Sequence, residues 1–232
     1  MQMHMHMRPR VIVNVAMSAD GKISTRERRQ VKISGAEDFA RVDRLKAGCD
    51  AVAVGIGTVL ADDPSLTVKN PGLKAERQRS GLPEHPVRVV IDGKARTPPD
   101  VSILNKGDGL RVIAVSERAD PARVEALREK ATVITAGKDE VDLSRVLDEL
   151  GQIGIRSLMV EGGGTLIAGF IRAGLVDEIY TYIGSIVIGG KDAPTLADGE
   201  GWIRESDFAR LVLADMTRID DGILLHWTVK RT

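Results

Sequence analysis

The stretch Ser157-Leu-Met-Val-Glu161-Gly-Gly-Gly164-Thr165-Leu-Ile-Ala168 runs from an apolar segment through an acid and three glycines into a helical pattern. Glycine has no Cβ atom, so a loop of three glycines lets the backbone approach a ligand closely. The unpaired N–H groups at the start of the following helix favour an anion. We interpret the stretch as a strand–loop–helix cradle for a phosphate group, with the Glu161 carboxylate at its lip.

The composition is that of an ordinary globular chain. Of the 232 residues, 43% are hydrophobic and 28% are charged, which allows one large domain or two small ones. The formal net charge is zero and only 3% of the residues are aromatic, so a nucleic-acid partner is not expected. The single cysteine excludes an intrachain disulfide framework and a multi-cysteine zinc site.

The hydropathy pattern favours a cytoplasmic protein without a membrane partner. No apolar run reaches the roughly 18 residues of a spanning helix. The first ten residues lack the apolar core of a signal peptide. We expect residues 1–8 to be a disordered terminus. The alternation of Met and His within residues 1–7 would suit a soft metal ion, but termini are rarely ordered and no metal site is predicted.

Short β-branched runs alternate with helical patterns, as in an α/β fold. The earlier strands are predicted at Val11–Val15, Ala51–Val54, Val87–Ile91, Arg111–Val115, Thr132–Thr135 and Ser157–Val160. Most of these runs are continuously apolar, which is typical of strands covered on both faces. After Asp177 the helical patterns fade, and strands are predicted at Glu178–Ile188, Leu211–Leu213 and Ile223–Val229. This order predicts one domain, residues 1–232, with a mixed sheet that is parallel at its centre and antiparallel at its C-terminal side.

Capping residues mark the helix starts. Ser34-Gly-Ala-Glu37 indicates a capping box. The apolar residues that follow it at helical spacing are Phe39, Val42 and Leu45. Asp120-Pro121 and Asp142 mark two further starts, and a helix from Thr165 to Ala173 follows the glycine loop. The Pro/Gly-rich stretch Lys69–Pro86 is predicted to be a long surface loop.

Three more strands end in polar turns, within Asn14–Ser24, Val54–Lys69 and Val90–Pro98. The carboxyl ends of parallel strands converge on one edge of a sheet, so these turns and the glycine loop predict a single ligand crevice. The glycine spacing does not fit the Rossmann fingerprint, and there is no P-loop. Beside a phosphate cradle, Lys94 and Arg96 become candidates for binding a second phosphate.

Four motifs occur in order: N-x-x-M-S-A-D-G-K from Asn14, G-I-G-T-V-L-A-D-D-P-x-L-T from Gly55, I-D-x-K-A-R-T-P from Ile91 and V-E-G-G-G-T-L from Val160. Together they resemble the reductase family of riboflavin biosynthesis, which has a dihydrofolate-reductase-like three-layer fold. The resemblance covers nearly the whole chain from Pro9 onward. Many family members are fused to a zinc deaminase, whose P-C-x-x-C signature is absent here, so the resemblance is to the stand-alone type.

The resemblance implies NADPH-dependent reduction of 2,5-diamino-6-(ribosylamino)-4(3H)-pyrimidinone 5′-phosphate to its ribitylamino counterpart, by hydride transfer to C1′ of the ring-opened imine. The implied cofactor contacts are Thr58, Asp62, Ile91, Asp92, Gly93, Lys94, Glu161, Gly162, Gly163, Gly164 and Thr165. The implied substrate contacts are Asn14, Ser18, Lys22, Ser65, Leu66 and Lys69. Asp20 and Glu161 are the two candidates for the proton donor.

Two positions depart from the family pattern. Fused relatives tend to have an arginine where Lys69 stands, which puts a bidentate phosphate contact there in doubt. Gly93 replaces a commoner serine and removes one hydroxyl that could contact the cofactor. The resemblance also implies a homodimer, and the apolar Ile179–Ile188 would be an unusual exposed edge unless it were paired or covered.

Other functions remain open at this point. The deaminated compound, 5-amino-6-(5-phosphoribosylamino)uracil, could be the substrate instead. A dihydrofolate reductase would keep the fold, but its pterin pocket needs aromatic walls, and the chain has only three Phe and two Trp. A nucleotide-binding module without turnover could use the same polar groups as the enzyme.

Overall fold

The computed structural model describes residues 8–29 and 31–230. The Met/His segment at residues 1–7 lies outside this part. Arg8, which the sequence placed in a disordered terminus, donates hydrogen bonds to the Leu175 carbonyl and to the Asp177 carboxylate, the latter at 3.2 Å. No helix within the described residues is long and apolar enough to cross a bilayer.

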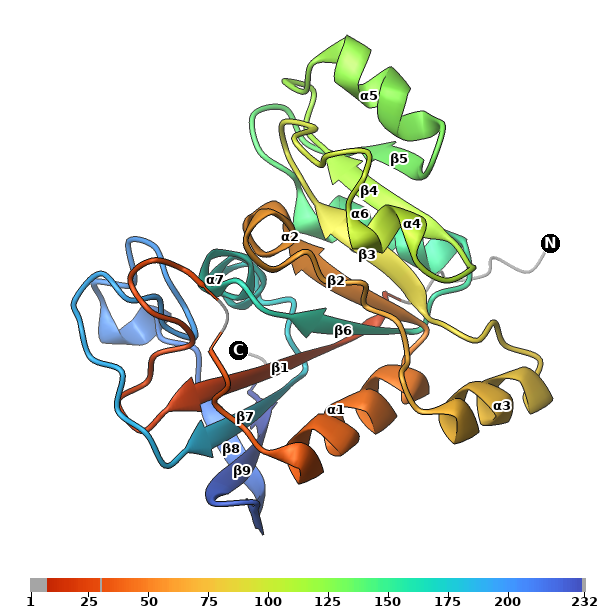
Figure 1. The fold of residues 1–232 in the computed structure, drawn as a ribbon. Coiled ribbons are helices and arrows are strands. Elements are labelled where there is room, and N and C mark those ends of the chain that lie inside the picture. Colours follow the sequence, from red (N-terminus) through yellow and green to blue (C-terminus); the bar gives the residue numbers. More distant parts are fainter. Residues whose placement is uncertain (1–7, 30, 231–232) are drawn as a thin grey trace, which may run out of the picture.

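All strands of the described chain join one nine-stranded sheet with the order β5-β4-β3-β2-β6-β1-β7-β9-β8 (Figure 1). Their bounds are β1 Arg10–Ser18, β2 Ala51–Gly55, β3 Val87–Ile91, β4 Arg111–Val115, β5 Thr132–Thr135, β6 Ser157–Glu161, β7 Glu178–Gly184, β8 Leu211–Ile219 and β9 Gly222–Val229. The strands β1 to β7 pair in parallel, while β9 and β8 are antiparallel additions. The predicted mixed sheet is thus confirmed.

Helices cover both faces of the sheet, which gives three layers. Their bounds are α1 Ala36–Gly48, α2 Ile56–Asp62, α3 Pro71–Arg79, α4 Ser102–Asn105, α5 Pro121–Arg128, α6 Leu143–Gln152 and α7 Gly164–Arg172, with a short 3₁₀ turn η1 at Glu205–Asp207. One apolar cluster packs α6 and α7 against one face. A second packs α1, α2, α4 and α5 against the other. Successive residues of a strand belong alternately to the first and the second cluster, because neighbouring side chains of a strand point to opposite faces of the sheet.

The start of α1 differs from the prediction. The capping box was wrong: Gly35 is the N-cap, and no side chain of the local sequence caps the helix. Instead the Asp220 carboxylate, from the β8–β9 turn, accepts the backbone N–H groups of Glu37 at 3.2 Å and Asp38 at 3.0 Å. A Cβ atom at position 35 would lie 2.4 Å from the Asp220 carboxyl carbon, so this contact needs glycine. Of the apolar residues at helical spacing, Val42 and Leu45 pack against the core, whereas Phe39 is 53% exposed.

The predicted loop Lys69–Pro86 was also wrong in part, because it contains α3. Asn70 caps this helix by accepting the N–H groups of Gly72 and Leu73, and Pro71 occupies the first helical position. Arg77 of α3 is almost fully buried and donates to the carbonyls of residues 47, 49 and 83. Asn70-Pro71 is a helix-start signal in the sequence, but the residues that follow are mostly polar and show no clear apolar periodicity.

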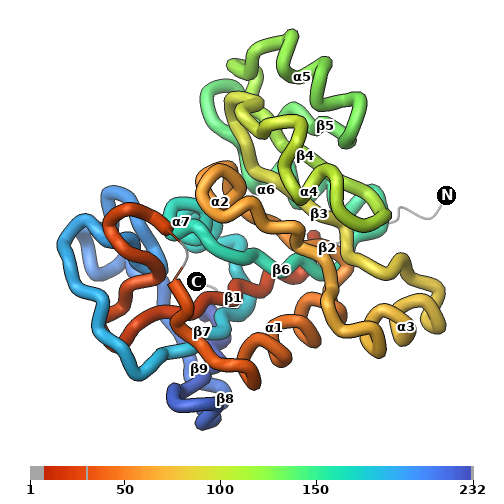
Figure 2. The backbone as a smooth tube through the Cα atoms, viewed as in Figure 1, coloured from red at the N-terminus to blue at the C-terminus, as the bar shows by residue number. Residues whose placement is uncertain are grey.

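Strand β7 is shorter than the predicted Glu178–Ile188, since it ends at Gly184. The next residues leave the sheet and run beside the segment that follows β1 (Figure 2). The Ala19 N–H donates to the Ile186 carbonyl at 2.8 Å, and the Ile23 N–H donates to the Pro194 carbonyl at 3.0 Å. Two connections far apart in sequence therefore form one wall above the carboxyl ends of the strands.

Candidate active-site cleft

A cleft of about 790 Å³ opens at the carboxyl ends of β1, β2, β3 and β6. Its walls are the end of β1, the start of α2, the turn after β3, and the glycine loop between β6 and α7. Its volume lies within the usual range for cofactor and small-molecule sites. The convergence predicted from four separate turns is therefore present in the fold. The predicted site residues that line it are Asn14, Thr58, Asp62, Ile91, Gly93, Lys94, Arg96, Glu161, Gly162, Gly163, Gly164 and Thr165.

The three glycines of the loop serve different purposes. Gly162 and Gly163 have φ angles of +68° and +84°, which residues with a side chain rarely adopt. A Cβ atom on Gly163 would lie 3.3 Å from the Thr58 hydroxyl, inside the cleft. Gly163 is also the N-cap of α7 and provides no capping side chain, so the first N–H groups of the helix remain available to an anion. Gly164 packs on the other wall, where a Cβ atom would lie 2.3 Å from the Thr195 carbonyl oxygen.

Glu161 ends β6 at the bottom of the cleft and forms an ion pair that the sequence did not predict. Its carboxylate lies 3.4 Å from the Lys46 ammonium group, and both side chains are largely buried. Lys46 belongs to the last turn of α1, and no local pattern identified it. A carboxylate and an ammonium group in contact can pass a proton between them and on to a bound ligand.

Asp20, Ser18 and Lys22 are absent from the residues that line the cleft. The Asp20 carboxylate accepts hydrogen bonds from the Ser18 hydroxyl at 2.6 Å and from the N–H groups of Ile188 at 3.0 Å and Gly189 at 2.8 Å. The Ser18 bond is the main cause of a lowered pKa of about 2 for Asp20. The Lys22 ammonium group donates to the Ala193 carbonyl at 3.1 Å. These groups fasten the wall of two connections together, and Asp20 is ionised at neutral pH.

Ser65, Leu66 and Lys69 form a separate group beside α1. The Lys69 ammonium group donates to the hydroxyls of Ser65 and Thr67, both at 2.7 Å. Leu66 is buried with a φ angle of +53°, which turns the backbone between these hydroxyls. Burial lowers the pKa of Lys69, and the charge of Lys46 adds to this effect. Lys46 therefore links the Lys69 group to Glu161.

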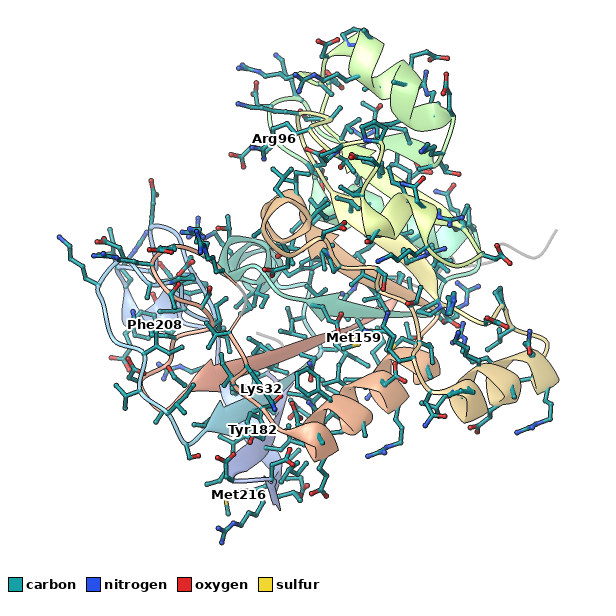
Figure 3. All side chains as sticks on the ribbon, viewed as in Figure 1. Lys32, Arg96, Met159, Tyr182, Phe208 and Met216 are labelled. Carbon is teal, nitrogen blue, oxygen red and sulfur yellow. The ribbon has the colours of Figure 1, made fainter. Side chains whose placement is uncertain are left out.

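The turn after β3 is held by Asp92. This side chain is fully buried and accepts the N–H and the hydroxyl of Thr97, both at 2.7 Å, so it shapes the turn and does not line the cleft. The Gly93 carbonyl accepts from the Ser116 hydroxyl at 2.7 Å. The turn thus directs Lys94 and Arg96 to the cleft, and Arg96 is labelled in Figure 3.

Comparison with known proteins decides the family. The RibD C-terminal domain family matches residues 9–225. The chain belongs to the RibD C-terminal domain family. It is 50% identical over 199 residues to the 2,5-diamino-6-ribosylamino-4(3H)-pyrimidinone 5′-phosphate reductase of Archaeoglobus fulgidus, covering 86% of this chain and 90% of that protein. The protein of the same name from Methanothermobacter thermautotrophicus is 46% identical over 224 residues, which cover 97% of this chain and all of that protein.

A solved structure with the same architecture is RibD of Acinetobacter baumannii, with a TM-score of 0.79 and 24% sequence identity. The match covers 97% of this chain and 59% of that chain, and at this identity it shows the fold alone. The dihydrofolate-reductase-like fold expected from the sequence is confirmed for this RibD C-terminal domain.

Several lining residues of this RibD C-terminal domain were missed by the sequence analysis. They include Ile23, Arg28, Asp139, Glu140 and Pro194. Ile23 and Pro194 belong to the two connections that Asp20 and Lys22 hold together, and their side chains line the cleft. Asp139 and Glu140 come from the connection between β5 and α6, where the glycine, Gly137, was not recognised as part of a ligand-binding turn. Acids and cations therefore both contribute to the cleft.

Proposed function

We propose that this chain is an NADPH-dependent reductase of riboflavin biosynthesis, which converts 2,5-diamino-6-(ribosylamino)-4(3H)-pyrimidinone 5′-phosphate to the ribitylamino product. Two relatives that match nearly full length carry the name of this reductase. The observation that carries the proposal is one cleft that joins a glycine phosphate cradle to the buried Glu161–Lys46 pair. A reductase needs a place for a dinucleotide and a proton source beside it. The cytoplasmic location expected from the sequence stays a prediction.

The cradle fits the pyrophosphate of a nicotinamide dinucleotide. The Gly163 position leaves the space that a Cβ atom would fill, and the N-terminus of α7 offers uncapped N–H groups there. Thr58 and Asp62 of α2 form the adjoining side. When bound, the nicotinamide supplies a hydride for C1′ of the ring-opened substrate imine. Ile23, Ser24 and Pro194 belong to the wall of two connections and line the same cleft, where they would shield the reacting carbon from water.

Reduction of an imine also requires a proton for its nitrogen, and Glu161 is the proposed source. Its carboxylate lies in the cleft, whereas Asp20 is bound by three donors outside the lining and has its pKa lowered to about 2. Asp20 therefore lies away from the substrate nitrogen, whereas the Lys46 ammonium group can pass a proton to the substrate through the Glu161 carboxylate. Lys46 and Lys69 are the proposed contacts for the substrate 5′-phosphate, together with Ser65, whose hydroxyl accepts from Lys69.

The direct test is an assay of the purified chain with NADPH and the two pyrimidine substrates. We expect NADPH oxidation with the diamino ribosylamino compound. Turnover of only the deaminated uracil compound would move the assignment to that reaction. Tight NADPH binding without turnover of either compound would instead make the chain a nucleotide-binding module.

Lys94 and Arg96 are proposed to bind the 2′-phosphate that separates NADPH from NADH. Replacing both by alanine should lower kcat/KM for NADPH roughly tenfold to a hundredfold, since one or two charge-assisted hydrogen bonds are lost. The value for NADH should change little, because NADH lacks that phosphate. Steady-state kinetics with both cofactors measure the ratio, and an unchanged ratio would place the 2′-phosphate elsewhere, for example near Arg28.

The chain is also proposed to form a homodimer, but through a different strand from the one the sequence indicated. Strand β7 lies inside the sheet between β1 and β9, so Ile179–Ile188 provides no open edge. The described sheet ends at β5 and at β8, and β8 exposes several large apolar side chains (Figure 3 labels Met216). They are Leu211, Val212, Leu213 and Met216. A long apolar edge strand is normally covered by a partner.

Replacing Leu213 by glutamate should therefore convert a dimer to a monomer, as measured by light scattering after gel filtration. Leu110 is a matched control, because it is 43% exposed and Leu213 is 47% exposed, yet it lies on the far side of the sheet before β4. Leu110→Glu should leave the mass unchanged. A wild-type chain that elutes as a monomer at high concentration would contradict the proposal.

A further inference from the structure

Asn14 lies at the bottom of the cleft and is held in one orientation. Its side-chain carbonyl oxygen accepts a hydrogen bond from the Arg41 guanidinium at 2.7 Å. A guanidinium group has only N–H donors, so the oxygen of the carboxamide must face Arg41. Within the described chain no acceptor is found for the Asn14 amide N–H groups, and this nitrogen is not among the buried atoms that lack a partner. The amide nitrogen therefore presents its two donors to the cleft that Asn14 lines.

Arg41 is itself fixed from three sides. Its Nε atom donates to the Asp38 carboxylate at 2.7 Å, and Asp38 is 2% exposed. Its guanidinium carbon lies 5.8 Å from the centre of the Tyr180 ring, within the range of a cation–π contact. Tyr180 in turn stacks on His226 with ring centres 4.2 Å apart and nearly parallel planes. Arg41 therefore has little freedom to release Asn14.

These contacts belong to one row across the sheet. Glu161, Asn14, Tyr180 and His226 are direct neighbours on β6, β1, β7 and β9. Helix α1 covers this row and contacts it twice, with Lys46 at Glu161 and Arg41 at Asn14. The first contact places an ammonium group beside the proposed proton donor, and the second sets the direction of the neighbouring amide.

We propose that Arg41 is a positioning residue, which orients the Asn14 amide so that the substrate is recognised through an acceptor oxygen placed next to Glu161. The inference rests on the proposed function, since Asn14 is there a substrate contact. The matching substrate group is a carbonyl, hydroxyl or phosphate oxygen. Without Arg41 nothing holds the carboxamide oxygen in place, and the amide donors no longer face the substrate in a fixed direction.

The test compares Arg41→Met with Arg41→Lys. Methionine cannot donate, so KM for the pyrimidine substrate should rise roughly three- to tenfold, the effect of one hydrogen bond. Lysine still has only donors and should keep KM within about twofold of the wild type. KM for NADPH should stay unchanged in both, because the cradle is on the α7 side of the cleft. Arg44→Met on the exposed side of α1 is the matched control.

A second variant tests the same contact in case Arg41→Met fails to fold. Asn14→Asp keeps an oxygen for Arg41 and should retain the melting temperature, but it replaces the donors that face the substrate. KM for the substrate should rise at least about tenfold, because an acceptor then faces an acceptor. Equal losses in Arg41→Met and Arg41→Lys, or an unchanged substrate KM in Asn14→Asp, would overturn the inference. A wild-type chain without any turnover would instead count against the proposed function.

Discussion

Replacing Glu161 by glutamine is expected to lower kcat about 100- to 10,000-fold, the range that a positioned general acid contributes. Glutamine keeps the size of the side chain and can still accept a hydrogen bond from Lys46, but it cannot deliver a proton to the substrate nitrogen. KM for NADPH should change little, because the backbone of the glycine loop is the proposed binding site of that cofactor. Steady-state kinetics with melting curves separate the loss of chemistry from a loss of folding.

Two controls define this experiment. Glu161→Gln leaves the Lys46 charge with only a neutral partner in a site where both side chains are largely buried. The double variant with Lys46→Met removes that charge, and it should recover stability without recovering kcat. Asp20→Asn should act mainly on the wall of two connections and reduce kcat far less. If Asp20→Asn instead abolished turnover at an unchanged melting temperature, Asp20 would be the proton donor and Glu161 only a neighbour of the substrate.

Much of the fold could be predicted because most of its strands are short apolar runs that are separated by polar or helical segments. Runs rich in Val and Ile, such as Val87–Ile91 and Arg111–Val115, match the observed strands residue for residue. Helix signals were reliable where the cap is local, as at Asp120 and Asp142, whose side chains accept the first free N–H groups. The prediction failed for α1 because its cap, Asp220, lies more than 180 residues away in sequence.

Only the part of the site that is built from the carboxyl ends of the strands could be predicted from the sequence. The glycine loop, Thr58 and the turn after β3 come together because parallel strands direct their carboxyl ends to one edge. The contributions of α1 could not be foreseen in the same way. Lys46 contacts Glu161 and Arg41 contacts Asn14 because of how this helix packs over β6, β1 and β7. Asp20 shows the reverse case, since a motif residue expected in catalysis is used to fasten two connections.

Gly163→Val is expected to raise KM for NADPH roughly ten- to hundredfold while the chain still folds. The added side chain would occupy the space beside the Thr58 hydroxyl, where a Cβ atom alone would already approach to 3.3 Å. It would keep the pyrophosphate away from the first N–H groups of α7, and one charge-assisted hydrogen bond is worth about 1.5–3 kcal/mol. At about 1.4 kcal/mol for each factor of ten, its loss gives the expected range. Titration of the protein with NADPH measures the same quantity without turnover.

Backbone strain is the competing explanation, because valine is disfavoured at the Gly163 φ angle of +84°. Gly174 provides the matched control at the opposite end of α7, with a φ angle of +65° and open space around its Cβ position. Gly174→Val should lower the melting temperature by a similar amount and leave NADPH affinity unchanged. Weaker NADPH binding in Gly163→Val alone would therefore locate the pyrophosphate at the glycine loop. Equal affinity in both variants would mean that the cofactor phosphates bind elsewhere in the cleft.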